Sequence, residues 1–260
     1  MKSTILPKIT IITITFNSEK TLEETINSIL GQNYDNLEYL IIDGGSIDGT
    51  MKIVDKYRER IAFAVSEPDK GISDAFNKGI AHATGEIIGI INSDDILLPG
   101  ALAAVANQYT PDIDVYSGNV MMWNEHTGNY YIRKPSMSFS YSSTNLRACH
   151  PGRFIARKAY EKYGVYSVDM RYRMDLDLLV RFYNRGAKFI HIDQPLTKFR
   201  VGGASSDTMG KKRNDFYLFV TNNGGSKLDF YILWIKANIK SFGKRVLFAL
   251  FGEKLKYKNH

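Results

Sequence analysis

The 260-residue sequence has one cysteine, Cys149, so it can form no disulfide within the chain. A lone thiol fits a reducing compartment, such as the cytoplasm. No uninterrupted apolar run approaches the roughly 20 residues that a helix needs to span a bilayer. The first residues lack the charged, apolar and small-residue regions of a signal peptide. We therefore expect neither a leader nor a transmembrane helix.

Repeats, low-complexity stretches and recognisable nucleic-acid-binding motifs are also missing. The net charge is +7, but it is unevenly distributed. Residues 227–260 contain eight basic and two acidic residues, which leaves the preceding 226 residues nearly neutral. A nucleic-acid-binding protein more often carries a basic patch on its folded body, beside a motif. We therefore expect no nucleic-acid partner.

The first half of the sequence alternates strand and helix patterns. β-Branched apolar runs predict strands, and apolar residues at helical spacing predict helices between them. Such alternation predicts an α/β fold with a Rossmann-like, mainly parallel sheet that is flanked by helices. The predicted strands cover residues 9–14, 37–42, 61–65, 86–91 and 115–120; the predicted helices cover 19–30, 48–57, 72–83 and a segment beginning at Pro99.

The second half is less regular. Residues 133–148 are rich in Ser, Met, Tyr and Pro and predict a mobile loop. A helix is predicted over 174–184, strands over 188–192 and 196–201, and a helix over 211–221. Gly224 and Gly225 form a natural hinge. We divide the chain there into a body, residues 1–225, and a basic amphipathic tail, residues 226–260.

Polar residues follow the first four predicted strands. Ligands of an open α/β sheet bind at the carboxyl ends of its strands, so these segments predict a site on one edge of the sheet. They are Thr15-Phe16-Asn17, the DGGS segment from Asp43, Glu67-Pro68-Asp69, and Asn92-Ser93-Asp94-Asp95.

Each segment has a chemical and a purely structural interpretation. Asp94 and Asp95 repel each other and suit a hard divalent cation with oxygen ligands, but the pair taken alone favours a solvated turn before Pro99, since short acidic pairs are common. Asp43 can accept hydrogen bonds from a base or ribose, whereas Asp48 can cap the following helix. Lys70 can meet a phosphate, and Asp74 or Asn77 can reach into a cleft; a capped helix start explains the same residues.

Seven blocks in order resemble glycosyltransferase family 2, whose fold is called GT-A. They are residues 12–17, DGGSIDGT (43–50), SEPDKGISDAFNKG (66–79), ATGEIIGIINSDD (83–95) with LLPGAL (97–102), HPG (150–152), RMDLDLLVR (173–181) and FRVGGASS (199–206). The resemblance covers roughly residues 8–206. It is closest to members that build bacterial O-antigen and capsular polysaccharides.

The resemblance implies roles for matching positions. Asp95 would ligate Mn²⁺ or Mg²⁺, and Asp175 would be the catalytic base. Ser93-Asp94-Asp95 stands where the family motif reads Asp-any-Asp, which weakens Asn92 as a metal ligand, and Met174 stands where many members have Glu. His150, Asp177 and Arg200 are candidates for contacts with the acceptor or the sugar. The nucleotide-sugar donor would be held by Thr15, Phe16, Asn17, Glu19, Asp43, Lys70, Asp74, Asn92, Ser93 and Asp94.

The resemblance also implies the reaction. Residues 1–120 would bind a nucleotide-sugar, a UDP-hexose or UDP-N-acetylhexosamine, and residues 121–225 an acceptor hydroxyl on a lipid-linked saccharide. One displacement would invert the anomeric carbon. Two alternatives stay open: a nucleotidyltransferase, although no basic Gly-rich phosphate loop follows the first strand, and a non-catalytic nucleotide-sugar binder or membrane scaffold. From the residues alone, Asp175 and Asp177 could be surface charges, with Arg181 paired to Asp177.

The tail contains an apolar, aromatic-rich segment, residues 228–251, with Lys236, Lys240 and Lys244 at four-residue spacing. A basic amphipathic helix of this kind is typical of a peripheral membrane anchor. We expect it to contact the cytoplasmic face of the membrane. The alternative is packing against the body or against a second subunit of a homo-oligomer.

Overall fold

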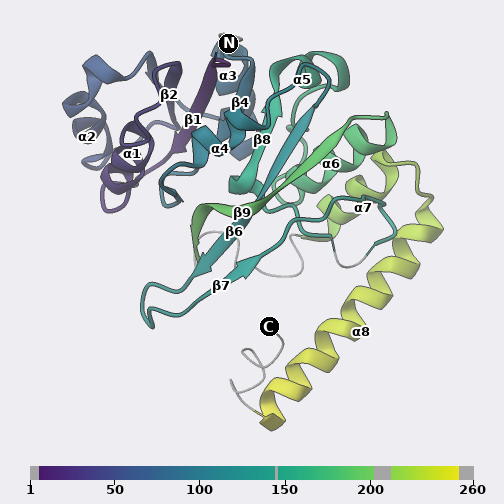
Figure 1. Ribbon diagram of the computed structural model, residues 1–260. Helices are drawn as coiled ribbons and strands as arrows, with labels where there is room; N and C mark the ends of the chain where they lie inside the picture. The colour runs from purple at the N-terminus through teal and green to yellow at the C-terminus, as the bar shows by residue number, and fades with distance from the viewer. Residues whose placement is uncertain (1–5, 144–145, 202–211, 252–260) are drawn as a thin grey trace.

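The computed structural model describes residues 6–143, 146–201 and 212–251, and side chains throughout these ranges except at 212 and 240–251. One nine-stranded sheet runs through the molecule (Figure 1). Its strand order is β3-β2-β1-β4-β8-β6-β9-β5, with β7 paired to β6. The α/β fold with a GT-A type of sheet is confirmed, and the sheet is mixed: its first half is parallel, and antiparallel strands join it to the second half.

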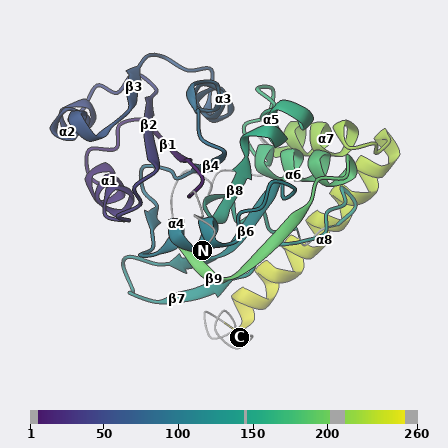
Figure 2. The same cartoon turned by 45° about the horizontal axis from the view of Figure 1, so that its top comes forward.

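The parallel half follows the predicted pattern. Its strands are β1 (Ile9–Thr15), β2 (Leu37–Asp43), β3 (Phe63–Ser66) and β4 (Ile87–Ile90), connected by α1 (Leu22–Leu30), α2 (Thr50–Lys56), the short 3₁₀ helix η1 (Arg58–Arg60) and α3 (Ile72–His82). Successive strand residues point to opposite faces. Ile12, Leu40 and Ile90 therefore pack into one core cluster, and Ile11 and Ile41 into the other. Helices cover both faces (Figure 2), as the unbroken apolar strands require.

The second half of the sheet combines two long strands, which pair in parallel, with short strands that pair in antiparallel. It contains β5 (Ile96–Leu97), β6 (Val115–Trp123), β7 (Tyr130–Arg133), β8 (Arg153–Ala156) and β9 (Phe189–Arg200), with α4 (Ala101–Asn107) before β6. The two strands predicted over 188–192 and 196–201 are one strand, β9, which pairs with β6 in parallel. The pairing shifts register between Gly118 and Val120, opposite Pro195. Pro cannot donate to the ladder, so it lies at this irregularity.

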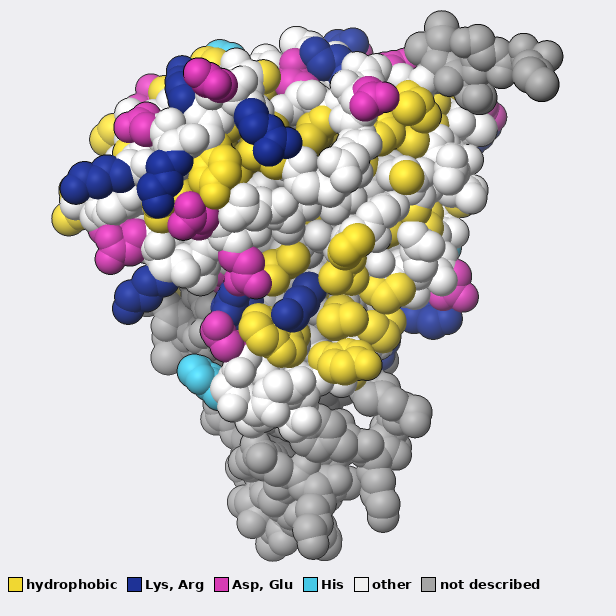
Figure 3. Space-filling view, turned by 60° about the vertical axis from the view of Figure 1, so that its left-hand side comes forward, with side chains coloured by type: hydrophobic (Ala, Val, Ile, Leu, Met, Phe, Trp, Pro, Cys, Tyr) yellow, Lys and Arg dark blue, Asp and Glu magenta, His cyan; other side chains and the backbone are white. Residues whose placement is uncertain are grey.

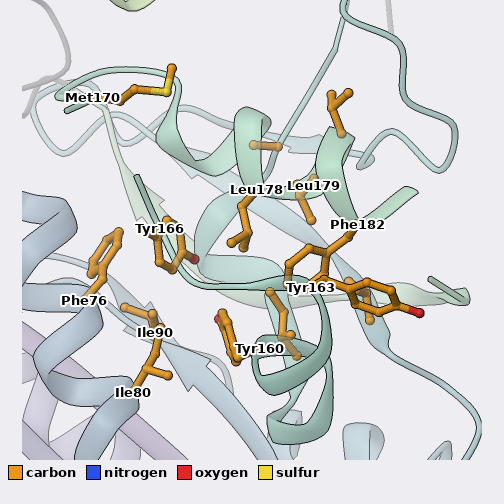
Figure 4. Packing of buried hydrophobic residues seen from close by; sticks show 14 of the residues in the cluster. Phe76, Ile80, Ile90, Tyr160, Tyr163, Tyr166, Met170, Leu178, Leu179 and Phe182 are labelled. Carbon is orange, nitrogen blue, oxygen red and sulfur yellow. The ribbon is translucent and has the colours of Figure 1, made fainter. Parts of the chain in front are cut away.

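Strand β8 and helix α5 (Arg157–Tyr163) were not predicted from the sequence. Strand β8 lies between β4 and β6 and is antiparallel to both. Residues Tyr160, Tyr163 and Tyr166 pack with Leu178, Leu179 and Phe182 of α6 (Met174–Asn184) and reach Phe76 and Ile80 of α3 (Figure 4). This packing places residues from both halves of the molecule in one core cluster.

The last two helices are α7 (Lys212–Asn222) and α8 (Lys227–Phe251), and Gly224, with φ 90°, lies in the turn between them. Phe230, Leu233 and Trp234 of α8 pack against the core near Phe216, and the rest of α8 extends from the body (Figure 1). Within residues 6–251, as far as the structure describes them, no helix is long and apolar enough to cross a membrane. Tail residues 252–260 lie outside the described residues.

Acidic and basic side chains are interspersed over the face shown in Figure 3, and hydrophobic side chains gather in its lower part. This mixture agrees with the nearly neutral charge of the body. The cationic charge of the chain is concentrated in residues 227–260.

Candidate active site

The loops that follow β1, β2 and β4 are joined by hydrogen bonds at the carboxyl edge of the parallel strands. The Asn17 backbone N–H donates to Ser46 Oγ over 2.7 Å, and Asn17 Oδ1 accepts the Ile47 N–H over 3.0 Å. The Ser18 and Ser93 hydroxyls are 2.8 Å apart. Asn17 itself has φ 49°, a left-handed conformation that Asn tolerates better than most residues. The polar segments after β1, β2 and β4 therefore lie together at one rim.

Asp43 organises the centre of this rim. Its carboxylate is fully buried and accepts the backbone N–H groups of Gly45 and Ser46 over 3.1 and 2.8 Å. The hydroxyls of Ser46 and Ser66 donate to it as well. Because four donors already converge on this carboxylate, its first role is to fix the β2 and β3 loops.

Two further predicted residues also hold the loops in place. Asp48 accepts the Thr50 N–H at the start of α2 over 2.9 Å, which agrees with its predicted capping role. Glu19 accepts the Gly49 N–H over 2.8 Å. Both residues tie the β1 loop to the β2 loop, so the shape of the rim is fixed before any ligand binds.

Thr15 and Phe16 leave groups open to a ligand. Thr15 Oγ1 is buried and has no hydrogen-bond partner in the structure. Phe16 is 60% exposed and its ring contacts the Gly44 position, where the absence of a Cβ also lets the Asp69 carboxylate approach. An exposed aromatic ring beside buried polar groups is a suitable surface for a nucleobase.

The Asp94-Asp95 pair lies beyond β4. Asp95 is fully buried, and within the described residues its carboxylate receives two long hydrogen bonds, from Asn92 Nδ2 at 3.2 Å and from the Arg200 backbone N–H at 3.4 Å. Burial and the neighbouring Asp94 raise the pKa of Asp95 well above its ordinary value. Burial also raises the pKa of Asp94. The positive charge of Arg200 opposes both shifts only in part.

Arg200 is the cation that interacts with this pair, but its guanidinium is already paired with two other acids. The guanidinium forms ion pairs with Glu24 on α1, at 2.8 Å, and with Glu125 beyond β6. Its Nε donates to the Asp94 carbonyl over 3.3 Å, and its side chain lies 5.0 Å from the Trp123 ring. Arg200 was predicted to contact the acceptor or the sugar; the structure places it against the acidic pair. Glu24 and Glu125 were missed because they lie outside the blocks that resemble the family.

This arrangement fits a divalent cation that is bound together with a ligand. In the described residues, no three His, Cys, Asp or Glu side chains gather to hold a metal by themselves. However, Asn92 Oδ1 is buried without a partner beside Asp95. Oxygen atoms with unmet charge are the ligands that Mg²⁺ and Mn²⁺ prefer, and substrate phosphates commonly complete the shell.

The loop after β3 combines exposed and committed groups. Lys70 is exposed, and its backbone N–H donates to Asp74 Oδ2 over 3.0 Å. Asp74 also pairs with Lys78 at 3.6 Å. Asn77, which could have reached into a cleft, instead binds the backbone N–H and C=O of Tyr166. That residue therefore joins α3 to the second half of the molecule.

Asp175 and His150 meet at a small cavity on the same side of the molecule. Strand β8 runs antiparallel to β4, with Gly89 opposite Phe154. The segment just before β8, which contains His150, is thereby brought to the carboxyl end of β4. Asp175 is the second residue of α6 and its Oδ1 accepts the Leu176 N–H over 2.8 Å. Both side chains line the cavity, together with Arg153 and Tyr166.

Asp177 is a correction to the predicted site. Its carboxylate is completely buried and is bound by Arg181 Nε at 2.9 Å and by Asn223 Nδ2 at 3.0 Å. The predicted pairing with Arg181 is present, but below the surface. An enclosed and fully paired carboxylate has no free side toward an acceptor, so Asp177 anchors α6 to the end of α7.

Similar structures identify the class of fold. A mannosyltransferase from Pyrobaculum calidifontis, solved with GDP-Man and Mn²⁺, matches with a TM-score of 0.65 at 22% identity, over 89% of this chain and 69% of that one. TarS residues 1–349 of S. aureus, solved with UDP-GlcNAc, match with a TM-score of 0.65 at 17% identity, over 96% and 77%. The fold is that of GT-A glycosyltransferases.

The sequence comparisons give the family. The model of Glycosyl transferase family 2 matches residues 10–164, so the chain belongs to this family and is a glycosyltransferase. The putative glycosyltransferase EpsE of Bacillus subtilis is 28% identical over 83% of this chain and 79% of its own length. GlyG of Streptococcus pneumoniae is 33% identical, but the match covers 50% of this chain and 45% of GlyG. A GalNAc(5)-diNAcBac-PP-undecaprenol beta-1,3-glucosyltransferase of Campylobacter jejuni is 25% identical, over 83% and 72%.

Proposed function

We propose that this protein is an inverting glycosyltransferase that moves a sugar from a UDP-hexose or UDP-N-acetylhexosamine to a hydroxyl of a lipid-linked oligosaccharide, in the synthesis of a surface polysaccharide. The observation that carries the proposal is the Asp94-Asp95 pair at the rim, in which Asp95 is fully buried and Asp94 half-buried, while the neighbouring Arg200 is paired with Glu24 and Glu125. Two structural neighbours were solved with nucleotide-sugars, and the Campylobacter relative is named for an undecaprenol-linked acceptor.

The donor would lie across the rim. Phe16 offers a face for the base, and the buried Thr15 hydroxyl lacks a partner that a polar ligand can supply. Asp43, Asn17 and Glu19 would act mainly by fixing the loops that surround the nucleotide. Lys70 is exposed at the β3 end and could pair with the diphosphate. Residues 1–120 would thus form the donor half, and residues 121–225 the acceptor half.

A divalent cation, Mn²⁺ or Mg²⁺, would be held by Asp95, with Asp94 and Asn92 beside it and phosphate oxygens of the donor completing its shell. When bound, such a cation neutralises negative charge on a departing diphosphate. Arg200 would contribute by holding the Asp94 carbonyl and the Asp95 carboxylate in place.

Asp175 would be the general base. Its carboxylate accepts the proton of the acceptor hydroxyl while that oxygen forms a bond to the anomeric carbon, and the bond from this carbon to the diphosphate oxygen breaks. One displacement inverts the configuration. General bases contribute about 10²–10⁴-fold to rate, so Asp175→Asn should lower turnover by a factor in this range.

The test is nucleotide release from a panel of UDP-, GDP- and dTDP-sugars with Mn²⁺, Mg²⁺ or EDTA, in the presence of polyprenyl-linked saccharide acceptors. We expect metal-dependent release of UDP from one donor and its loss in Asp175→Asn, with donor binding retained. Anomeric analysis of the product by NMR should show inversion. Donor binding without turnover in the wild type would favour a non-catalytic binder, and release of pyrophosphate from a nucleoside triphosphate would favour a nucleotidyltransferase.

Residues 226–260 would keep the enzyme at the cytoplasmic face of the membrane, where a lipid-linked acceptor is found. Helix α8 supports this role because its two sides differ. Phe230 and Leu233 are buried against the body, whereas five apolar residues on the opposite side are 43–67% exposed: Leu228, Tyr231, Ile232, Ile235 and Ile239. An exposed apolar stripe with nearby lysines is typical of helices that lie in a membrane interface.

A further inference from the structure

His150 is a half-buried residue for which the reaction described above has no defined role. It begins a short 3₁₀ helix, η2 (His150–Gly152), after Cys149 in a left-handed conformation. The ring stacks on Phe76 with 4.8 Å between centroids and 18° between planes. The Tyr166 ring lies at its edge, 6.4 Å away, and Figure 4 shows Phe76 and Tyr166 beside each other. These contacts fix the direction of the imidazole.

Nε2 of His150 is buried and has no hydrogen-bond partner in the structure. A buried polar atom without a partner costs free energy, so native proteins leave few of them. The cavity lined by His150 and Asp175 has room for about one water molecule or hydroxyl group. A hydrogen-bond partner for Nε2 can therefore come from a group that enters the cavity or from the Asp175 carboxylate itself.

The other polar groups around this cavity are already bound. The Arg153 guanidinium donates to the carbonyls of Ala148 and Ser136, over 2.7 and 2.8 Å, and to the Ser117 hydroxyl. Asp175 uses Oδ1 for the Leu176 N–H. Within the part of the chain that the structure describes, neither Asp175 Oδ2 nor His150 Nε2 has a hydrogen-bond partner.

The charged and titratable groups that face His150 are Asp175 from α6, Arg153 from β8, Tyr166 from the segment after α5, and the adjacent Cys149. Burial lowers the pKa of His150, and Asp175 opposes this effect only in part. The imidazole is therefore neutral at neutral pH. A neutral imidazole with its proton on Nε2 is a hydrogen-bond donor.

We propose that His150 is a positioning residue for Asp175: its Nε2–H donates, directly or through one water molecule, to the carboxylate and holds Oδ2 toward the acceptor hydroxyl. The inference rests on the proposed function, because it presupposes Asp175 as the base. Catalytic hydrogen bonds are often long in ligand-free structures and shorten when substrate binds. A hydrogen bond donated to a carboxylate favours its ionised form and so lowers its pKa.

Two substitutions separate positioning from packing. His150→Phe keeps a ring against Phe76 but removes Nε2, whereas His150→Gln retains an amide N–H that can reach the place of Nε2. We expect His150→Phe to lower kcat by about 10- to 100-fold, the range for a lost hydrogen bond to a charged group. The KM for the donor should stay unchanged, and the acidic limb of the kcat/KM profile should move to higher pH. His150→Gln should recover most of kcat.

Equal losses in the two variants with an unmoved acidic limb, or full activity of His150→Phe, would overturn the proposal. These outcomes differ from failure of the proposed function, which would appear as wild-type activity in Asp175→Asn.

A measurement on the wild-type chain covers the case in which both substitutions prevent folding. We expect imidazole ¹⁵N NMR to show a neutral ring protonated at Nε2, with shifts that change in Asp175→Asn. Identical His150 signals in the two proteins would contradict the inference.

Discussion

Two buried acids lie at opposite ends of the parallel half of the sheet, and they differ in how well their negative charge is compensated. Glu38 lies at the amino end of β2, where Lys8 Nζ pairs with it at 2.7 Å and the Thr10 hydroxyl donates over 2.6 Å. Thr84 adds its backbone N–H over 2.8 Å. Burial opposes ionisation of Glu38, but these donors outweigh it and lower the pKa to about 2.

Asp95 lies at the carboxyl end of β4 and receives far less compensation. It forms no ion pair within the described residues, its two hydrogen bonds are 3.2 and 3.4 Å long, and burial together with the neighbouring Asp94 raises its pKa. The same fold thus satisfies one buried acid completely and leaves another unsatisfied. Because folding alone disfavours the second arrangement, we interpret it as a site completed by a ligand.

The largest expected effect is that of Asp95→Asn. If the carboxylate is kept for a cation and a diphosphate, its loss should lower transfer activity by about 100-fold or more. In EDTA the same substitution should leave Tm unchanged or raise it by about 2–4 °C, because about 1 kcal/mol of charge burial is relieved. Activity assays and thermal unfolding with and without Mn²⁺ measure both effects. A large fall in Tm in EDTA would mean that Asp95 is a structural acid after all.

Glu38→Gln should give the reverse result. Removing the charge that Lys8, Thr10 and Thr84 stabilise should lower the free energy of unfolding by about 2 kcal/mol, while activity persists at temperatures where the protein is folded. The pKa of Glu38 is lower in the folded state than its ordinary 4.5. Its stabilisation is therefore present above pH 4.5 and is lost as the pH falls toward 2. Chemical denaturation between pH 7 and pH 2 should show a smaller loss in the variant, and equal slopes would refute the assignment.

The parallel half was predictable because its signals are local. β-Branched runs such as Ile9–Thr15 fix the strands, and polar residues directly after them fix the edge at which a site forms. The position of the Asp94-Asp95 pair follows from that pattern. The incomplete compensation of the pair's negative charge could not be predicted from that pattern, because it depends on Arg200 being paired with Glu24, 176 positions earlier in the chain.

The second half of the sheet was less predictable, because its elements also depend on contacts between residues that are distant in the sequence. Strand β8 has only four residues and is recognisable through its pairing with β4 and β6, not through any periodicity of its own. Asp175 and Asp177 are two positions apart on one helix, yet one lines a cavity and the other is enclosed by Arg181 and Asn223. The spacing of the two acids in the sequence could not separate their roles. The residue Asn223, which binds Asp177, lies after the last block that resembles the family, so no sequence signal pointed to this contact.

The same contrast applies to apolar side chains of α8, where Ile235→Ser has the smallest expected effect on stability. Phe230 is 3% exposed and Ile235 is 57% exposed, five residues apart on opposite sides of one helix. Phe230→Ala should cost about 3–5 kcal/mol as a buried aromatic residue, whereas Ile235→Ser should change stability by less than about 0.5 kcal/mol. If the outer face contacts the membrane, Ile235→Ser should nevertheless weaken sedimentation with vesicles that contain anionic lipid, and Ile239→Ser should add to the effect. Undiminished vesicle binding combined with a concentration-dependent change in molecular mass would instead assign this face to a second copy of the chain, because only self-association makes mass depend on protein concentration.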